Sequence, residues 1–529
     1  MKAMIAVNEL TPSKKKAIMF VVFFLGLMQN FSSNMFNTTG TAIVADLSGV
    51  EYYTLQFTIF TLVSGIFIPI FGNLGDIQGR RRWLGIGAVL FAVGSAVMWL
   101  APSMLVVLIG RVIASVAQAI MSANYLTLIG EISNEKERPM FMTINGAGIG
   151  VAQMLAPILA GAFIDNISWR IVFLFLTVLS IVSMILVFAM IPTIKTPAME
   201  KGEHKQPDWG GGITVALFGL AFLLAFTWGN SKGWGSPTLI VLYIVAVIAI
   251  LAFVMFEKKG SNPLMPFHLF KYRGFTLGLI AMVLYGPACF TFSAYTAQIG
   301  VGVLGLSSTI SGTFLTVHAA GYLIFSFIWG KLISVKGPKA LKPVQLICLL
   351  GLALSMVSFT FMRPGNSSFI LYFAEFIGGA FNAAIIVGFT QIIQKEIPRD
   401  YIGTGTSLLQ FMMKLGGTLG ITIGGMLMGS TWSKGVGGIL ASAGSLGEEV
   451  TGKLQSSGTL LNTPGLASLR DGVAAESQGL FDSTLASLRM LLSSSVSKIF
   501  WMAAILLVIS CILMAFVKNS AAKKDAENA

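Results

Sequence analysis

The stretch GNLGDIQGRRR, residues 72–82, brings one carboxylate and three guanidinium groups together between two long apolar runs. The run FTIFTLVSGIFIPIF comes directly before it, and WLGIGAVLFAVGSAVMWLA comes directly after it. Only 11% of the residues in the chain are charged, so this concentration of charge is unusual here. It is typical of a short polar connection between two helices that cross a membrane, because charge is costly in the bilayer core.

The composition of the whole chain indicates the same class of protein. Its 529 residues are 55% hydrophobic and have a mean hydropathy of +0.81, which is too apolar for a water-soluble protein. A helix that crosses a bilayer needs about 20 mostly apolar residues. Windows of that kind predict an all-α integral membrane protein with about fourteen spans, which begin near Ala17, Thr54, Trp83, Met104, Phe141, Arg170, Gly211, Pro237, Gly274, Ser307, Leu341, Phe369, Gly403 and Ile499.

Basic residues are distributed among the connections, so the net charge of +13 does not indicate a nucleic-acid partner. Counted from the first span, the other connections are nearly bare apart from one long loop, whereas alternate connections hold Lys14 to Lys16, Arg80 to Arg82, Lys258, Lys259, Lys271, Arg273, Lys331, Lys336, Lys339, Lys342, Lys523 and Lys524. Basic connections of membrane proteins stay in the cytoplasm. We therefore expect a multi-pass protein of the cytoplasmic membrane, surrounded by lipid bilayer, with both termini in the cytoplasm.

The motif at residues 72–82 returns in altered form later in the chain. In GKLISVKGPK, residues 330–339, Gly330 and Gly337 repeat Gly72 and Gly79, but Ser334 stands where Asp76 would be. Likewise GRVIASVAQAI (110–120) aligns with AEFIGGAFNAA (374–384). Such repeats are typical of secondary transporters, whose binding site lies near the membrane midplane between the halves. The expected division of the chain is a six-helix bundle, an inserted helix pair and a second six-helix bundle, at residues 1–195, 196–273 and 274–529.

One segment of the second bundle does not fit the membrane. Residues 431–497 are rich in serine and glycine and fall outside the cell in the expected topology. Its later part, GLFDSTLASLRMLLSSSVSKIF (479–500), repeats apolar residues at intervals of three and four, as an amphipathic helix lying on the membrane would. We expect a helical cap or hairpin; the alternative is a flexible extracellular loop without a role in transport.

These motifs resemble those of the major facilitator superfamily, and more narrowly of its fourteen-span drug:proton antiporters. GNLGDIQGRRR is similar to the family motif between spans 2 and 3, and GRVIASVAQAI is similar to its span-4 motif. ISWRIVF (167–173) looks like the Trp-Arg signature that opens span 6, and LGGTLGITIGG (415–425) looks like span 13. The resemblance covers nearly the whole chain. It implies the major-facilitator fold, with two six-helix bundles plus two inserted helices.

Two departures from the family pattern affect the expected chemistry. The span-5 motif keeps Pro157 and Gly161 but has Ala156 and Ala160 in place of glycines, and these small residues still permit close helix packing. Ser32 stands at the position where many relatives carry an aspartate late in span 1. An acid that is common among exporters of cationic drugs is therefore missing.

A conformational latch is expected at Gly72, Asp76, Gly79, Arg80 and Arg81. The glycines permit close backbone approach. Asp76 can accept hydrogen bonds or face a helix N-terminus, whose dipole favours negative charge by about 0.3–1 kcal/mol. A contact that forms in one conformation and breaks in the other would act as a latch. The alternative is that the arginines only fix the topology, for which Asp76 is unnecessary.

Two ionisable residues deep inside predicted spans are the candidates for proton coupling. Arg111 lies in an apolar helix, where a charge marks a functional site by default, and the resemblance assigns it a part in proton coupling; the alternative is a structural hydrogen-bonding role. Glu375 is the acidic residue that the sequence places deepest in a span. Because desolvation favours a neutral carboxyl, Glu375 is either a proton carrier or a structural ion-pair partner of Lys414 in the next span.

Polar and aromatic residues within the spans are expected to line a substrate cavity. They are Asn30, Asn34, Asn37, Gln118, Tyr285, Tyr295, Gln298, His318, Asn382 and Lys414. The three asparagines follow one face of a helix, and Gln118 shares a face with Arg111. Two alternatives stay open: the amides only hold helices together, or the aromatic residues belong to the core or face lipid.

The leading hypothesis is a monomeric, proton-driven antiporter that exports a small amphipathic organic compound by rocking its two halves. A second hypothesis keeps the fold but assigns an anionic cargo, such as a fatty acid or another carboxylate metabolite, because the span-1 acid is absent. A third is a membrane sensor without transport. An enzyme is not expected, because acid, base and nucleophile do not cluster. Neither a cofactor nor a metal is expected, because the three cysteines show no metal-ligand spacing.

Overall fold

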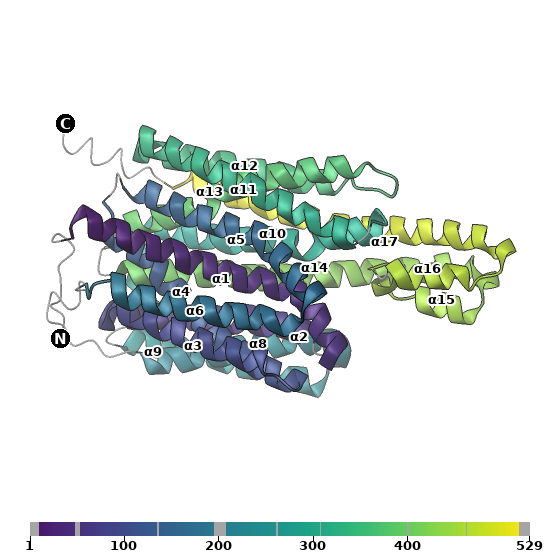
Figure 1. The fold of residues 1–529 in the computed structure, drawn as a ribbon, viewed down its shortest axis with the longest axis horizontal. Coiled ribbons are helices and arrows are strands. Elements are labelled where there is room, and N and C mark those ends of the chain that lie inside the picture. Colours follow the sequence, from purple (N-terminus) through teal and green to yellow (C-terminus); the bar gives the residue numbers. More distant parts are fainter. Residues whose placement is uncertain are drawn as a thin grey trace.

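The computed structural model describes residues 10–47, 53–134, 137–194, 208–260, 263–306, 308–398, 401–461 and 463–517. These ranges contain fourteen long helices, whose arrangement is drawn in Figure 1. They are α1 (Pro12–Leu47), α2 (Tyr53–Gln78), α3 (Arg80–Trp99), α4 (Met104–Ile132), α5 (Arg138–Asn166), α6 (Trp169–Met190), α8 (Trp209–Lys232), α9 (Pro237–Lys259), α10 (Arg273–Ala297), α11 (Ser308–Lys336), α12 (Leu341–Phe359), α13 (Ser368–Glu396), α14 (Ile402–Ala441) and α17 (Gln478–Ala515). The predicted all-α membrane fold is confirmed.

Hydropathy agrees with this assignment. Within the described residues, twelve of the long helices are apolar and long enough to cross a bilayer. The other two, α2 and α8, contain shorter apolar segments, Leu62–Gln78 and Trp209–Phe222. Local signals set the helix ends: the Asp208 side chain accepts a 2.8 Å hydrogen bond from the Gly211 amide to begin α8. Gly79, with a φ of 89°, separates α2 from α3.

Two large apolar cores hold the helices together. One is drawn from residues 10–194 and lies among α1 and α3–α6, and the other is drawn from residues 269–517 and lies among α10–α14 and α17. The helices α8 and α9 form a smaller cluster with α2. The division of the chain into two bundles and an inserted pair stays a prediction.

The two halves meet through equivalent helix pairs, α2 with α14 and α5 with α11. In α2, Gly72 lies against Ser407 of α14, and in α11, Gly330 lies against Thr143 of α5. A Cβ atom at either glycine would overlap the facing side chain, so both positions require the smallest residue. Gly337 has a φ of 70° and ends the second copy of the motif, as a glycine of positive φ ends the first. The contacts therefore follow the internal repeat seen in the sequence.

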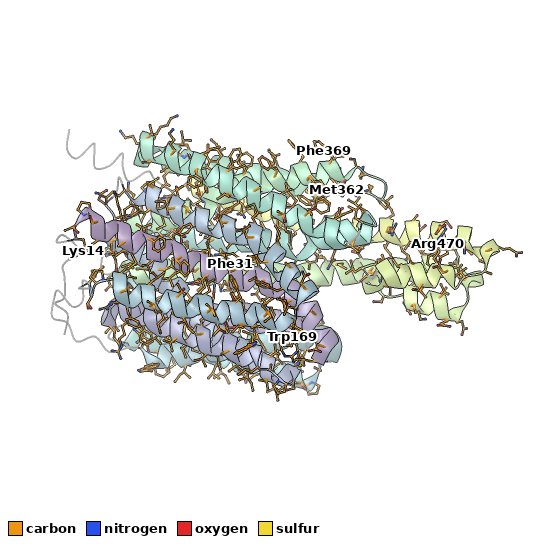
Figure 2. The ribbon with its side chains drawn as sticks, in the orientation of Figure 1. Lys14, Phe31, Trp169, Met362, Phe369 and Arg470 are labelled. Carbon is orange, nitrogen blue, oxygen red and sulfur yellow. The ribbon has the colours of Figure 1, made fainter. Side chains whose placement is uncertain are left out.

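A helical cap extends beyond the bundle at the end opposite the start of α1 (Figures 1 and 2). Figure 2 shows Arg470 in this cap and Lys14 at the other end of the molecule. The cap consists of the last turns of α14, the first turns of α17, and the segments η7 (Gly444–Leu446), α15 (Glu448–Leu454), η8 (Ser457–Leu461), α16 (Thr463–Asp471) and η9 (Ala475–Ser477). The expected helical cap is thus present.

Residues 479–500 do not form a separate amphipathic helix of the kind that lies on a membrane. They belong to α17, which runs without a break from the cap into the bundle. Their apolar stripe has another partner, because Phe481, Leu488 and Leu492 are buried in one core with Trp432 and Leu454. The three- and four-residue spacing therefore reports packing inside the cap.

Candidate functional site

The expected latch lies where the end of α2 meets the start of α14. Asp76 forms an ion pair with Arg80, one helical turn away, and its second oxygen accepts a 3.1 Å hydrogen bond from the hydroxyl of Thr404. Thr404 lies in the first turn of α14, so the carboxylate faces a helix N-terminus as expected. Gly403 lies against the ion pair, and a Cβ atom there would collide with both of its members.

Within the described part of the chain, the hydrogen-bond partners of Arg80 all lie in the amino-terminal half. Its guanidinium is 3% exposed and lies 2.9 Å from a carboxylate oxygen of Glu131 in α4. It also donates to the Gly72 carbonyl at 3.0 Å and to the side-chain oxygen of Asn124 at 3.2 Å. Asn124 and Glu131 were not among the predicted residues. The one signal for Glu131 was its place in GEISNE, which aligns with KEIPRD in the second half.

Arg81 points away from the contact between the halves. It donates to the hydroxyl of Thr193 at 3.0 Å and to the Phe188 carbonyl at 2.7 Å, at the end of α6. The structure thus does not bring Arg81 to Asp76, and the part of Arg81 in the latch stays a prediction. The reason is geometric: neighbouring residues in a helix point about 100° apart, so Arg80 and Arg81 cannot face the same partner.

The span-5 motif packs through its alanines. Ala156 and Ala160 are fully buried in α5, whereas Pro157 is half-buried within the helix. A Cβ atom added at Gly161 would meet nothing within 4 Å. Close packing of this motif is therefore carried by the two residues that depart from the family pattern, and Gly161 takes no part in it.

Two cations from different halves lie beside one aromatic ring. Arg111 of α4 is 2% exposed, and its guanidinium carbon lies 3.5 Å and 3.8 Å from the ring centres of Phe36 and Phe60. The ammonium of Lys414, from α14, lies 5.9 Å from the centre of the Phe60 ring and donates a hydrogen bond to Ser64. The two charges repel each other. We call this arrangement the cation pair.

A second cluster lies inside the carboxy-terminal half. The carboxyl of Glu375 is fully buried and accepts a 2.6 Å hydrogen bond from the hydroxyl of Thr296. Its other oxygen lies 3.0 Å from Nδ1 of His318. On the far side of the His318 ring, the Asn382 amide nitrogen lies 3.5 Å from Nε2, and the Tyr285 hydroxyl donates to the Asn382 side-chain oxygen at 2.5 Å. Four of the predicted residues thus form one chain of hydrogen bonds, which we call the acid cluster.

The expected alternative of an ion pair between Glu375 and Lys414 is wrong. Lys414 points from α14 to the amino-terminal half, whereas the partners of Glu375 come from α10 and α11. The sequence places both residues deep in adjacent spans but does not give the direction of either side chain. Arg111 is in the other half from Glu375, so its assignment to proton coupling stays a prediction.

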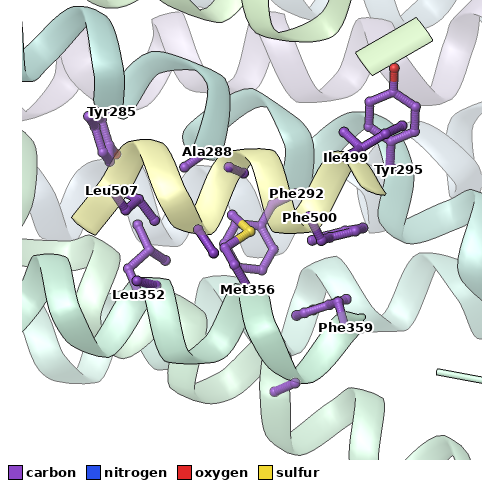
Figure 3. Close-up of a cluster of buried hydrophobic side chains, with 14 of the residues drawn as sticks. Tyr285, Ala288, Phe292, Tyr295, Leu352, Met356, Phe359, Ile499, Phe500 and Leu507 are labelled. Atoms are coloured by element: carbon purple, nitrogen blue, oxygen red, sulfur yellow. The ribbon is translucent and has the colours of Figure 1, made fainter. Parts of the chain in front are cut away.

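The aromatic residues of α10 belong largely to the core. Figure 3 shows Tyr285, Phe292 and Tyr295 along α10 among apolar side chains of α12 and α17. Tyr285 and Tyr295 are buried, and the Tyr295 hydroxyl donates to the Ile421 carbonyl at 3.2 Å. The structure favours the packing alternative for these rings.

The predicted amides of the amino-terminal half divide into two groups. Asn30 and Asn34 donate to carbonyls one turn earlier in α1, at 2.8 Å each, and are half-buried. The side chain of Asn37 lies outside the described residues. Gln118 is buried and donates to the Gln29 side-chain oxygen at 3.1 Å. Their role as substrate contacts stays a prediction.

Gln118 is part of a polar node that joins the two halves. Ser122 donates to the same Gln29 oxygen at 2.8 Å, and Gln410 of α14 donates to the Ser122 carbonyl at 2.9 Å. The contact between α14 and the amino-terminal half therefore runs from the latch through the node to Lys414.

Gln298, another of the predicted cavity residues, lies apart from this node. It begins η4 (Gln298–Val303), where α10 ends below the cap, and its side-chain oxygen is buried.

The Trp-Arg signature at the start of α6 also has a partner. Trp169 and Arg170 donate to one oxygen of Asp46, at 2.9 Å and 2.8 Å. These hydrogen bonds lower the pKa of Asp46 below its ordinary value of 3.8. At the opposite end, a hydrogen bond from Lys15 lowers the pKa of Glu137. Both contacts join α1 to its neighbours in the same half.

Comparison with known proteins identifies the family. Residues 22–420 match the family model described as Major Facilitator Superfamily. The chain belongs to this superfamily. It is 29% identical over 399 residues to the multidrug transporter protein MdtP of Bacillus subtilis, which covers 74% of this chain and 71% of the relative. It is 26% identical to multidrug resistance protein 3 of the same organism over 98% of this chain and 99% of the relative.

Solved structures of the superfamily share the fold. The human organic anion transporter MFSD10 superposes with a TM-score of 0.59 at 13% identity, covering 95% of this chain and 100% of that chain. The proton:xylose symporter XylE gives a TM-score of 0.59 at 16% identity, covering 96% of both chains. The protein is therefore a multi-pass membrane transporter with the major-facilitator fold, and not an enzyme.

Proposed function

We propose that this transporter is a proton-coupled exporter of small amphipathic organic compounds, which works by alternating access across the cytoplasmic membrane. The observation that carries this proposal is the acid cluster, in which a fully buried carboxyl is paired with a histidine. The names of the two Bacillus relatives, a multidrug transporter and a multidrug resistance protein, support the same class of cargo.

The acid cluster can hold one exchangeable proton. Glu375 and His318 are close enough to share it, because a neutral carboxyl can donate to Nδ1 and a carboxylate can accept from a protonated ring. Thr296 stabilises the carboxyl in either state, because its hydroxyl donates to the other oxygen. Asn382 connects the far side of the ring to Tyr285, so a change at Glu375 has a path to neighbouring helices. In this proposal Glu375 carries the proton and His318 shares it.

The latch takes part in the conformational change of the transport cycle. Asp76 holds α14 through Thr404, and it holds α3 through Arg80. When the halves separate at this end, the contact with Thr404 must break, whereas Arg80 keeps its partners in the amino-terminal half. The latch thus favours the conformation that is closed at the end bearing the start of α1. We place this end in the cytoplasm, because the basic connections lie there.

The membrane potential supplies enough energy for such a cycle. One proton that enters across about 100 mV releases about 2.3 kcal/mol. By the factor of ten for about 1.4 kcal/mol, this drives roughly fiftyfold accumulation of a neutral cargo. One chain contains both the acid cluster and the latch, so we propose that a monomer is sufficient for transport.

Transport by the Glu375→Gln variant tests the proposal. Glutamine mimics the protonated carboxyl, so we expect everted vesicles with this variant to lose accumulation driven by a pH gradient while the protein still binds cargo. Glu449→Gln is the matched control, because Glu449 is an exposed cap residue paired only with Lys453 along the same helix. A folded Glu375→Gln protein with full pH-driven accumulation would show that the proton is carried elsewhere.

A further inference from the structure

We infer that the cation pair binds the acidic group of an amphipathic organic anion, and that the exported cargo belongs to this chemical class. The inference rests on the proposed export function and adds the charge of the cargo. The cation pair is formed by Arg111 and Lys414 and lies between the two halves, on α4 and α14. In this fold a cargo binds between the halves.

The electrostatics of the pair favour a negative ligand. Among the described residues, Lys414 has a hydroxyl partner, Ser64, and no carboxylate within ion-pair distance. Arg111 lies close enough to Lys414 to repel it. A positive charge inside the bilayer is stabilised by a counter-charge. An anionic cargo would supply one to Lys414, whereas a cationic cargo would add a third positive charge beside Lys414 and Arg111.

The surroundings of Lys414 combine a small residue, partial exposure and aromatic rings. Gly65 of α2 lies opposite its stem, and a Cβ atom at Gly65 would already approach the Lys414 Cβ to 3.5 Å. The side chain of Lys414 is half-buried rather than sealed. Flanking aromatic rings, those of Phe36 and Phe60, offer apolar surface beside the charges. A ligand with an acidic group and a flat or apolar body fits these surroundings.

A second observation at the same contact indicates a ligand. Gln29 and Gln118 are 2% and 8% exposed, yet Nε2 of Gln29 and Oε1 of Gln118 have no hydrogen-bond partner among the described residues. Buried polar groups are normally satisfied, so these two atoms require a water or a ligand. Gln118 lies two helical turns from Arg111 on one face of α4, or roughly 10 Å along its axis. The body of a bound anion that extends along α4 would reach them.

Two probes that differ only in charge test the inference. Pyrenebutyl sulfonate and pyrenebutyl trimethylammonium share one fluorescent body, and both keep their charge at every working pH. In proteoliposomes with a pH gradient, we expect the wild-type protein to bind and move the sulfonate in preference to the ammonium compound. An inside-negative potential should accelerate this export, because anion exit and proton entry both carry positive charge inwards.

Variants at Lys414 locate the site. Lys414→Met should weaken sulfonate binding about ten- to hundredfold, the value of a hydrogen bond to a charged group. Lys414→Arg should keep most of the affinity because it keeps the charge. Lys453→Met in the exposed cap is the matched control. Melting temperature in detergent checks that each variant folds.

The outcomes separate this inference from the proposed function. If the wild-type protein moves the ammonium probe under a pH gradient and ignores the sulfonate, the anion site is refuted and proton-coupled export stands. If the sulfonate moves but Lys414→Met binds it as tightly as wild type, the anion binds elsewhere and the inference is also refuted. A protein that moves neither probe would contradict the anion site and the proposed function together.

Discussion

Replacing Thr404 with valine should open the end of the transporter that the latch holds closed. The hydroxyl of Thr404 donates to Asp76 at 3.1 Å, and this hydrogen bond joins α14 to the amino-terminal half. Valine keeps the shape of threonine but removes the donor. Asp76 keeps Arg80, and Arg80 keeps Glu131, so the amino-terminal half should remain folded.

The size of the effect follows from the burial of the contact. The Thr404 residue is 4% exposed and the Asp76 side chain is 17% exposed, so solvent replaces the lost hydrogen bond poorly. A hydrogen bond to a charged group contributes about 1.5–3 kcal/mol, and we take about 1–2 kcal/mol because Arg80 also neutralises the carboxylate. The ratio of closed to open molecules should therefore fall by a factor of about 5–30.

Distance measurement between two spin labels reads this ratio directly. Labels at Arg82→Cys on α3 and Lys336→Cys on α11 report the separation of the halves, after the three native cysteines have been replaced. Thr422→Val is the matched control, because Thr422 lies in the same helix and donates only to a carbonyl within it.

The double variant with Asp76→Asn decides whether the hydrogen bond is responsible. In the Asp76→Asn background, Thr404→Val should have a much smaller effect, because the charged acceptor has already been removed. A closed population within twofold of the wild type for Thr404→Val would refute the latch. An equally large effect of Thr404→Val in both backgrounds would refute its assignment to Asp76.

Three further predictions use the same molecule. Gly403→Ala should shift the label distances in the same direction as Thr404→Val, because its Cβ atom would displace Asp76 and Arg80, whereas Gly429→Ala, which meets nothing within 4 Å, should not. The lowered pKa of Asp46 means that its contact with Trp169 stabilises the fold above pH 3.8 and loses this contribution as the pH falls through the folded-state pKa. Asp46→Asn should thus lower the melting temperature at pH 7, and this loss should shrink as the pH falls below 3.8; a loss that stays the same over this range would contradict the account. In intact cells, Ser456→Cys in the cap should react with an impermeant thiol reagent and Ser334→Cys at the end of α11 should not, and the reverse pattern would invert the topology.

The membrane fold was readable from the sequence because hydropathy is a local property. Each of the fourteen expected spans corresponds to a long helix, and Asp76 was identified because topology alone does not require an acid in that connection. The partners of Asp76 and Glu375 were harder to predict from the sequence, because they lie far away along the chain. Thr404 lies 328 residues from Asp76, and His318 lies 57 residues from Glu375.

Side-chain direction accounts for most of the errors. Lys414 and Glu375 lie in adjacent predicted spans, but a helix rotates each residue by about 100°, and the two side chains face different halves. Arg81 was separated from Arg80 by the same rotation. The repeat of apolar residues in 479–500 correctly identified a helix with one buried face. It did not show whether that face is buried against a membrane or against the rest of the cap.

Proton movement driven by a cargo gradient tests the central claim most directly. Proteoliposomes that contain a pH-sensitive dye are loaded with the cargo and diluted into cargo-free buffer without an imposed pH gradient. An antiporter predicts acidification of the lumen as cargo leaves, no acidification with Glu375→Gln, and normal acidification with Glu449→Gln. Cargo efflux from the wild-type protein without any change in lumenal pH would contradict proton coupling.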